Sequence, residues 1–363
     1  MAGPMTSKLH RALPASVFLV LSASCFLLMD IPAMVYDYPS PSATGFISWS
    51  NKKVPILQEF HWISSLDKVF RDVTVGFAPS SFGYDDVSRW QMLNFMQDIG
   101  VLYLVWLCES TRAGNRWSVV YFPAIFNTIA QLGGGGVIIP LYYFLFIVFC
   151  PPTRVQTLAD RRITLGDALL WMLLTVLFHT LPGMAIYFAP DFETQHYWTW
   201  FWQLYPVRMS IVYFLVEGVS KILPIPRPRI VLRYSTTIRL ILFPMIAIST
   251  GVWIYTLLNC PYSLKTIFCP APLIEDTWLL RMRRILQFDE LFVYGSSMVW
   301  LGFLMMDAKK AGLVSGSGIA GFLVMAVGLT GIVGPGATFG VMWLWREGYL
   351  VDEEKDGEGL KRS

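Results

Sequence analysis

The sequence predicts an all-α, polytopic membrane helical bundle, and two observations lead to that fold class. The chain of 363 residues is 55% hydrophobic and only 15% charged, whereas a soluble domain carries roughly 25% charged residues. Several apolar runs also reach the ~20 residues that a helix needs to cross a bilayer. We therefore expect about eight transmembrane helices, or seven if the first run is a cleaved signal peptide.

The charge balance and the motif content exclude several classes of protein. A net charge of +3, spread over the loops, gives no sign of a nucleic-acid partner. The five cysteines show neither metal-ligand spacing nor a disulfide framework. The sequence contains no Walker motif, HExxH, nucleophile elbow or DDxxD-like acidic run. We therefore expect no cofactor and no metal ion.

We interpret residues 1–363 as one transmembrane domain with four parts. These are an N-terminal anchor span (1–35), a polar connection (36–86), a helical bundle (87–346) and a charged, disordered tail (347–363). The polar connection is too long for a turn, so it is interpreted as a lid or a membrane-surface segment such as Val54–Val75. The run PIPRPR (Pro224–Arg229) is typical of a stiff linker. No internal symmetry is evident.

Two glycine-rich runs interrupt expected spans. The expected spans are 15–35, 87–109, 119–149, 166–189, either 198–217 or 205–223, 238–258, 288–306 and 319–345. Gly133–Gly136, followed by Pro140, lets the backbone unwind, and unwound backbone survives in a membrane only against protein or a cavity. We expect this run to form a cavity wall. Gly334–Gly336 interrupts the last span in the same way.

The helix expected over 287–310 carries acids at both ends of an apolar run. Asp289 and Glu290 precede Leu291–Met306, which has no charged residue, and Asp307 follows it. Asp289 and Asp307 are eighteen positions apart, which returns them to the same helical face at ~3.6 residues per turn. The acids either belong to a functional stripe or mark the boundary with water.

The second expected span contains a polar stripe. Gln91, Asn94 and Asp98 fall at i, i+3 and i+7, and Glu109 lies close to the same azimuth. A carboxylate at membrane depth costs about 2.5–3.5 kcal/mol, so it should face protein and is a functional hypothesis by default. The alternative is a structural hydrogen bond to a neighbouring helix.

Three further polar residues are expected to contact a substrate. Asn127 and Gln131, at i and i+4, precede the first glycine run on one helical face. Arg208 lies either in the middle of its span or near its end. In the middle it needs an anionic partner, for which Asp98 is the natural candidate.

Acids and aromatic rings in a lipid-fed hollow suit one reaction class well, the proton-initiated cyclisation of an isoprenoid. A carboxyl group buried among apolar side chains stays protonated and can protonate an epoxide or an alkene. Aromatic faces stabilise a migrating carbocation by ~0.5–2 kcal/mol per ring, and the chain is 15% aromatic. Excluded water cannot quench the cation.

Five segments resemble the fungal membrane-bound terpene cyclases of the ascI type, found in meroterpenoid and indole-diterpene biosynthetic clusters. The segments are DIPAMVYDYP (Asp30–Pro39), WQMLNFMQDIG with the downstream CESTRAGN (Trp90–Asn115), GVIIPLYYF (Gly136–Phe144), QFDELFVYGSSMVWLGFLMMDAKKAG (Gln287–Gly312) and GPGATFGVMWLWRE (Gly334–Glu347). The resemblance implies a metal-independent cyclase of the isomerase or lyase type. Its substrate would be a prenylated, often epoxidised, intermediate of secondary metabolism.

These arguments lead to one functional hypothesis with two alternatives. The chain is interpreted as a multi-pass terpene cyclase of an internal membrane, the endoplasmic reticulum, acting on a lipophilic isoprenoid beside other membrane-bound pathway enzymes. The expected catalytic acids and bases are Asp98, Glu109, Asp289 and Glu290, and the expected substrate-binding residues are Asn94, Asn127, Gln131 and Arg208. The alternatives are a small-molecule transporter and a non-catalytic scaffold of the same pathway.

Overall fold

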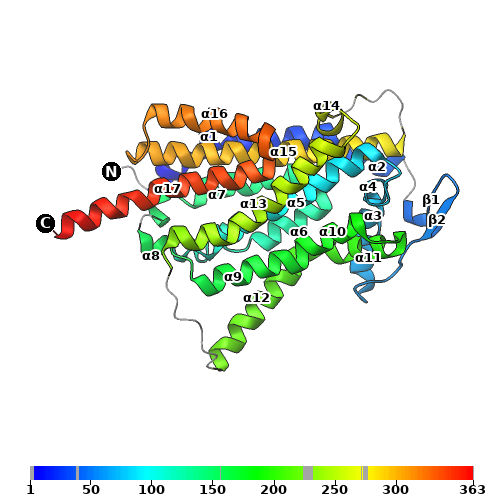
Figure 1. The fold of residues 1–363 in the computed structure, drawn as a ribbon, viewed down its shortest axis with the longest axis horizontal. Helices are drawn as coiled ribbons and strands as arrows, with labels where there is room; N and C mark the ends of the chain where they lie inside the picture. Colours follow the sequence, from blue (N-terminus) through cyan, green and yellow to red (C-terminus); the bar gives the residue numbers. More distant parts are fainter. Residues whose placement is uncertain are drawn as a thin grey trace.

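The computed structural model describes residues 4–37, 41–155, 157–223, 232–270, 272 and 277–362, and it is overwhelmingly helical (Figure 1). Its α-helices are α1 (Pro4–Met29), α2 (Ile31–Asp37), α3 (Ser64–Gly76), α4 (Ala78–Ser81), α5 (Asp86–Thr111), α6 (Pro123–Gly133), α7 (Gly135–Phe149), α8 (Leu158–Arg161), α9 (Leu165–Thr175), α10 (Leu181–Phe188), α11 (Phe192–Gln203), α12 (Tyr205–Ile222), α13 (Tyr234–Asn259), α14 (Leu264–Phe268), α15 (Trp278–Lys310), α16 (Gly316–Val333) and α17 (Pro335–Arg362). A π-helical turn, Val176–Thr180, joins α9 to α10.

Within the described ranges, five helical stretches are long and apolar enough to cross a membrane. They are Lys8–Met34, Leu158–Phe188, Tyr234–Asn259, Trp278–Lys310 and Gly316–Val333. Helix α5 has 26 residues but is buried on nearly every side, so it forms the core of the bundle. The all-helical class is confirmed, with fewer candidate spans than the eight that the sequence suggested.

The expected span over 119–149 is a helical hairpin. Phe126 of α6 lies against Tyr142 of α7, with ring centroids 5.1 Å apart. One continuous helix would separate residues sixteen positions apart by ~24 Å. The chain reverses at Gly134, whose φ of +86° is readily available only to glycine.

The expected last span, 319–345, also reverses. Phe322 of α16 packs on Trp345 of α17 with ring centroids 5.9 Å apart. The turn is at Gly334, where φ is +89°, and Pro335 begins α17 with a φ that suits the first helical position. Both glycine runs were therefore correctly identified as breaks, but each one folds the chain back on itself.

The two hairpins belong to two sets of four helices that pack in the same way. The first set is α1, α5, α6 and α7, and the second is α13, α15, α16 and α17. Helix α1 packs on α7 and α15, and α13 packs correspondingly on α17 and α5. The contacts are antiparallel in both sets, because Arg11 and Ser22 of α1 meet Ile147 and Val137 of α7, while α13 meets α17 through Tyr234–Glu347 and, further along, Trp253–Gly334.

The long helix of each set packs against the hairpin of the other set. Helix α15 of the second set runs parallel to α7, and α5 of the first set runs parallel to α17. The contacts that fix these directions are Asp289–Gly136 and Ser297–Tyr143 for α15 on α7, and Asp98–Gly336 and Glu109–Arg346 for α5 on α17. The fold therefore has an internal pseudo-twofold repeat, which the sequence analysis did not identify.

The polar connection forms a cap at the end of the bundle away from the described termini (Figure 1). It contains α3, α4 and an antiparallel hairpin of β1 (Phe46–Trp49) and β2 (Lys52–Pro55), paired from Phe46↔Pro55 to Trp49↔Lys52. Helix α11 packs on α3, α4 and β2. At the other end α17 is helical to Arg362, through most of the expected disordered tail. The expected linker Pro224–Arg229 lies outside the described residues.

His196 ties the cap to α11 and provides a pH-dependent anchor. Its Nε2 accepts the backbone N–H of Leu57 at 3.3 Å and the indole N–H of Trp200 at 3.3 Å. Burial lowers the pKa of His196 to about 4, against about 6.5 for an unfolded chain. Between these values the opened state binds more protons, so the stability of this attachment is complete above pH 6.5 and declines as the pH falls towards 4.

We predict that hydrogen exchange at the Leu57 amide, corrected for intrinsic rates, is faster at pH 5 than at pH 7.5. The His196→Gln variant, whose side-chain oxygen still accepts a hydrogen bond but does not titrate, should lose this pH dependence. Mass-spectrometric exchange on the detergent-purified protein measures both. Equal protection of the wild type at the two pH values would contradict the assignment.

Candidate active site

A cavity of about 340 Å³ lies between α3, α5, the α6–α7 turn and the first half of α15. Eight methionine and aromatic side chains line it, among aliphatic ones. They are Met29, Met34, Met92, Met282, Phe77, Phe95, Trp202 and Trp278. Methionine adapts to irregular ligands, and aromatic faces stabilise cations. Gly134 and Gly135 line the same space, so the expectation that the first glycine run forms a cavity wall is confirmed.

Asp289 is the acid of α15 that lines this cavity. Its Oδ1 accepts the backbone N–H of Gly136 at 2.6 Å. That N–H belongs to the first turn of α7, where backbone donors lack intrahelical partners and the helix dipole is positive. Asp289 therefore caps α7 from another helix and remains in contact with the cavity.

Two amides of α6 also line the cavity. Asn127 is buried and donates from Nδ2 to the phenolic oxygen of Tyr205 at 2.6 Å. Gln131, one turn later, is half-buried on the cavity wall. The i, i+4 spacing placed both on one face, as expected. Together they give an otherwise apolar wall its hydrogen-bonding groups.

Asp72 of α3 is a second cavity carboxylate that the sequence analysis did not identify. Ser42 donates a hydrogen bond to its Oδ1. The available signal was weak, because Asp72 lies in the segment Val54–Val75 that was interpreted only as a lid or a membrane-surface segment. The wall that α3 contributes to the cavity supports the lid interpretation.

Asp98 of α5 is not among the described residues that line the cavity. Its Oδ1 accepts the hydroxyl of Ser249 at 2.5 Å, and its Oδ2 accepts the backbone N–H of Gly336 at 3.0 Å. The carboxyl group is 2% exposed. Asp98 thus caps α17 as Asp289 caps α7, and the two acids occupy corresponding positions in the repeat. Helix α13 covers the Asp98 side chain through Ser249.

Glu290 and Asn94 are both buried in helix contacts outside the cavity lining. Gln91 donates to Oε2 of Glu290 at 2.6 Å, and Asn94 donates to the hydroxyl of Thr256 at 2.8 Å. These bonds link α5 to α15 and α13. The polar stripe predicted on α5 therefore exists, but it faces neighbouring helices.

Arg208 lies in the first turn of α12. It donates to the carbonyl oxygen of Phe201, and its guanidinium lies 4.5 Å from the centroid of the Phe201 ring and 5.7 Å from that of Phe60. Helix α12 agrees with the alternative span 205–223, in which Arg208 lies near an end, so the pairing with Asp98 that a central position would require does not apply. Among the described residues no ion pair joins Arg208 to Asp98. The near-terminal position of Arg208 in its helix explains why no buried counter-ion is required.

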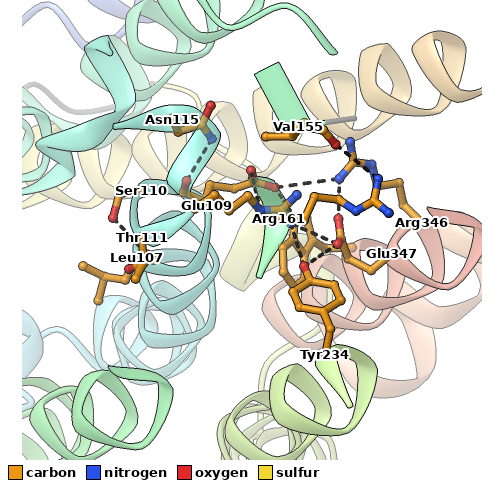
Figure 2. A network of polar contacts seen from close by, with 12 residues as sticks. Leu107, Glu109, Ser110, Thr111, Asn115, Val155, Arg161, Tyr234, Arg346 and Glu347 are labelled. Carbon is orange, nitrogen blue, oxygen red and sulfur yellow. Dashed lines mark hydrogen bonds and ion pairs between the residues drawn. The ribbon is translucent and has the colours of Figure 1, made fainter. Parts of the chain in front are cut away.

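Glu109 belongs to a buried ionic network at the far end of α5 (Figure 2). Arg112 lies 3.1 Å from Glu109 and 3.0 Å from Glu347. Arg346 pairs with Glu347, and Tyr234 donates to the same carboxylate at 2.5 Å. Two acids and two arginines balance within this cluster. Removing one member would leave an uncompensated buried charge, which is strongly destabilising.

The four acids therefore do not share one hollow, contrary to expectation. Of the eight predicted site residues, the cavity is lined by Asp289, Asn127 and Gln131. The other five hold helices together or lie at the cap. Within the described part of the chain, no three His, Cys, Asp or Glu side chains are placed to hold a metal ion. The cavity has one carboxyl group that caps a helix, a second carboxyl group on the lid, two amides and apolar walls.

The sequence also contains a GxGxxG run, GSGIAG, at Gly316–Gly321, which the sequence analysis did not identify. As a dinucleotide fingerprint it would follow a strand and open a helix of a βαβ unit. Here it begins α16 directly after the turn that ends α15, with Ser315 as the N-cap. The run therefore lacks the structural context of a nucleotide site.

Comparisons with known proteins place the chain among fungal sequences. A family model described as the CtvD domain matches residues 42–258, more than half of the chain. The chain is 26% identical to "FAD-dependent monooxygenase verC1" of Penicillium polonicum over 96% of its own length and 44% of that protein. It is 28% identical to "FAD-dependent monooxygenase anuJ" of Penicillium roqueforti over 84% of its length and 37% of that protein.

A third fungal relative is "FAD-dependent monooxygenase BOA8" of Botryotinia fuckeliana, 26% identical over 67% of this chain and 32% of that protein. The chain thus spans less than half the length of these curated relatives. No solved structure matches it. The family match includes α5 and the α6–α7 hairpin and ends before α15.

We predict that Asp98→Ala destabilises the protein more than Asp98→Asn. Alanine leaves the Gly336 N–H and the Ser249 hydroxyl without an acceptor, at about 1–3 kcal/mol each, whereas asparagine keeps one acceptor oxygen. Thermal unfolding of the purified proteins in one detergent should rank wild type above Asn above Ala. An alanine variant that melts with the wild type would show that this cap does not hold α17.

Proposed function

We propose that this chain, which belongs to the CtvD domain family, catalyses the proton-initiated cyclisation of an epoxidised lipophilic intermediate in fungal secondary-metabolite biosynthesis. The observation that carries the proposal is Asp289, the carboxyl group on α15 that opens onto a methionine- and aromatic-lined cavity. The resemblance to ascI-type terpene cyclases favours a prenylated substrate and an endoplasmic reticulum location. Five candidate spans suit a substrate that enters from the bilayer.

The names of the relatives support an oxygenated substrate. All three are named FAD-dependent monooxygenases, and this chain corresponds to less than half of each. Flavin monooxygenases transfer one oxygen atom, and with an alkene the product is an epoxide. The chain itself has no nucleotide-site context around its GxGxxG run. We therefore assign it the step that follows oxygenation, and we assign the oxygenation to a separate flavoprotein activity.

Asp289 would act as the general acid. Its Oδ1 is engaged by Gly136, so Oδ2 carries the proton that passes to the epoxide oxygen. One C–O bond of the epoxide then breaks, the oxygen stays on the neighbouring carbon as a hydroxyl group, and an internal alkene or oxygen nucleophile closes the ring on the other carbon. The N-terminus of α7 stabilises the Asp289 carboxylate left behind.

The final deprotonation returns a proton to a carboxylate, so the overall reaction is an isomerisation that consumes none. Asp289 can take the proton back, or Asp72 on the lid can accept it. The rings of Phe95 and Trp202 face the same space and would stabilise positive charge during closure. Asn127 and Gln131 would hold a polar group of the substrate.

We predict that Asp289→Asn lowers cyclisation by about 100-fold or more, the usual contribution of a general acid. Asparagine keeps an acceptor for the Gly136 N–H, so α7 stays capped. The control is Asp307→Asn on the same helix, where Asp307 pairs with Arg11 at 3.0 Å, distant from the cavity. Microsomes containing each variant are supplied with a prenylated epoxide, and ring-closed product is quantified by mass spectrometry.

Two outcomes would contradict this function. Equal turnover by Asp289→Asn and wild type would show that Asp289 takes no part in the reaction. If well-folded wild type closes no ring on prenylated or polyene epoxides, cyclisation is excluded as the function.

The pseudo-twofold repeat favours a second candidate, a transporter, because many transporters are built from repeats with discontinuous helices. Against it, the half-helix N-termini at Gly136 and Gly336 are already capped by Asp289 and Asp98. A flux assay in proteoliposomes separates the two. Product export without ring closure would favour the transporter.

A further inference from the structure

We propose that the Asp289 cavity selects electrically neutral ligands over anionic ones, so that carboxylates, phosphates and diphosphates are excluded from it. This inference rests on the proposed function for the site of binding, and it adds the chemical class of the ligand. It concerns the charges that line the cavity, not the reaction that takes place there.

The described titratable side chains of the cavity wall are both carboxyl groups. They are Asp72 and Asp289, and no Lys, Arg or His is among the residues that line the space within the described part of the chain. The remaining polar groups are the neutral amides of Asn127 and Gln131. An anion entering this wall would lose its hydration without gaining a cation, which is among the costliest forms of burial.

Three cations on the neighbouring helices are engaged elsewhere. Arg283 of α15 pairs with Asp85, and Arg281 lies 3.6 Å from Asp30. Arg71 of α3 donates to the carbonyl oxygen of Gln58 at 2.8 Å. Each of these contacts is with a residue that does not line the cavity. An anionic ligand would therefore have to break an existing interaction to recruit a counter-ion.

The positive end of α7 is also unavailable to a ligand. A helix N-terminus is a natural anion site, and the N–H of Gly136 at the start of α7 is already bonded to Asp289. The protein thus fills the anion site at the start of α7 with its own carboxyl group. The start of α15, where Trp278 lines the cavity, is capped by the Thr277 side chain. A diphosphate-bearing isoprenoid, the commonest charged form of such substrates, finds neither a cation nor a bare helix terminus here.

A matched pair of ligands tests the inference. The methyl ester of a terminally epoxidised farnesoic acid and its free acid differ only in charge at pH 8. A neutral diazirine analogue of the ester is photocrosslinked to the purified protein in nanodiscs, and each ligand is added as competitor. We expect the ester to compete about a hundredfold more strongly than the acid at pH 8. Peptide mapping should place the crosslink on α5 or α15.

Two controls make the result specific to charge. A carboxylic acid that binds only in its protonated form gains about tenfold in apparent affinity for each pH unit below 8, whereas the ester stays constant. Asp72→Asn should narrow the gap between acid and ester at pH 8, and Asp307→Asn should leave it unchanged. A merely structural role for Asp72 would alter both ligands equally.

The outcomes separate this inference from the proposed function. If acid and ester compete equally at pH 8, or if the crosslink maps away from the cavity, neutral selection is overturned. If the ester binds in the cavity but is never cyclised, neutral selection stands and the proposed reaction fails.

Discussion

The structure depends on satisfying backbone N–H groups where the chain reverses inside an apolar bundle. In hydrocarbon each unsatisfied backbone group costs several kcal/mol, and both hairpin turns expose the first N–H groups of a helix. Two carboxyl groups meet this need, Asp289 at Gly136 and Asp98 at Gly336. The acids that looked most functional in the sequence are thus first of all helix caps. The surroundings of the two acids differ, because Asp289 lines a cavity whereas Asp98 is covered by Ser249 of α13.

Much of the fold could be predicted from local pattern. Composition and apolar runs gave the helical class, and the glycine runs marked the breaks. The i, i+4 spacing of Asn127 and Gln131 placed them correctly on one face. The direction of the chain after each break could not be predicted, because Gly134 and Gly334 permit either a bent helix or a reversal. That choice is decided by tertiary contacts such as Phe126 with Tyr142.

The candidate site was predictable only in part, for a related reason. Periodicity assigns a residue to a face of a helix but not to the neighbour that the face meets. Asp98 and Glu109 share a stripe, yet one meets a helix N-terminus and the other meets Arg112. The arginines that pair with these acids come from the end of α5 and from α17, more than 230 positions apart. Asp72 lay in a segment without a strong period, so nothing in the sequence connected it to Asp289.

The exchange of caps between the two halves of the repeat affects how the chain can be assembled during synthesis. The α6–α7 hairpin leaves the ribosome about 150 residues before Asp289 is made, and until then the Gly136 amide lacks its native acceptor. The second hairpin has no such delay, since Asp98 is already present when Gly336 emerges. The amino-terminal hairpin therefore gains the cap of α7 only after α15 has been synthesised, so a helix inserted late completes the hydrogen bonding of one inserted early.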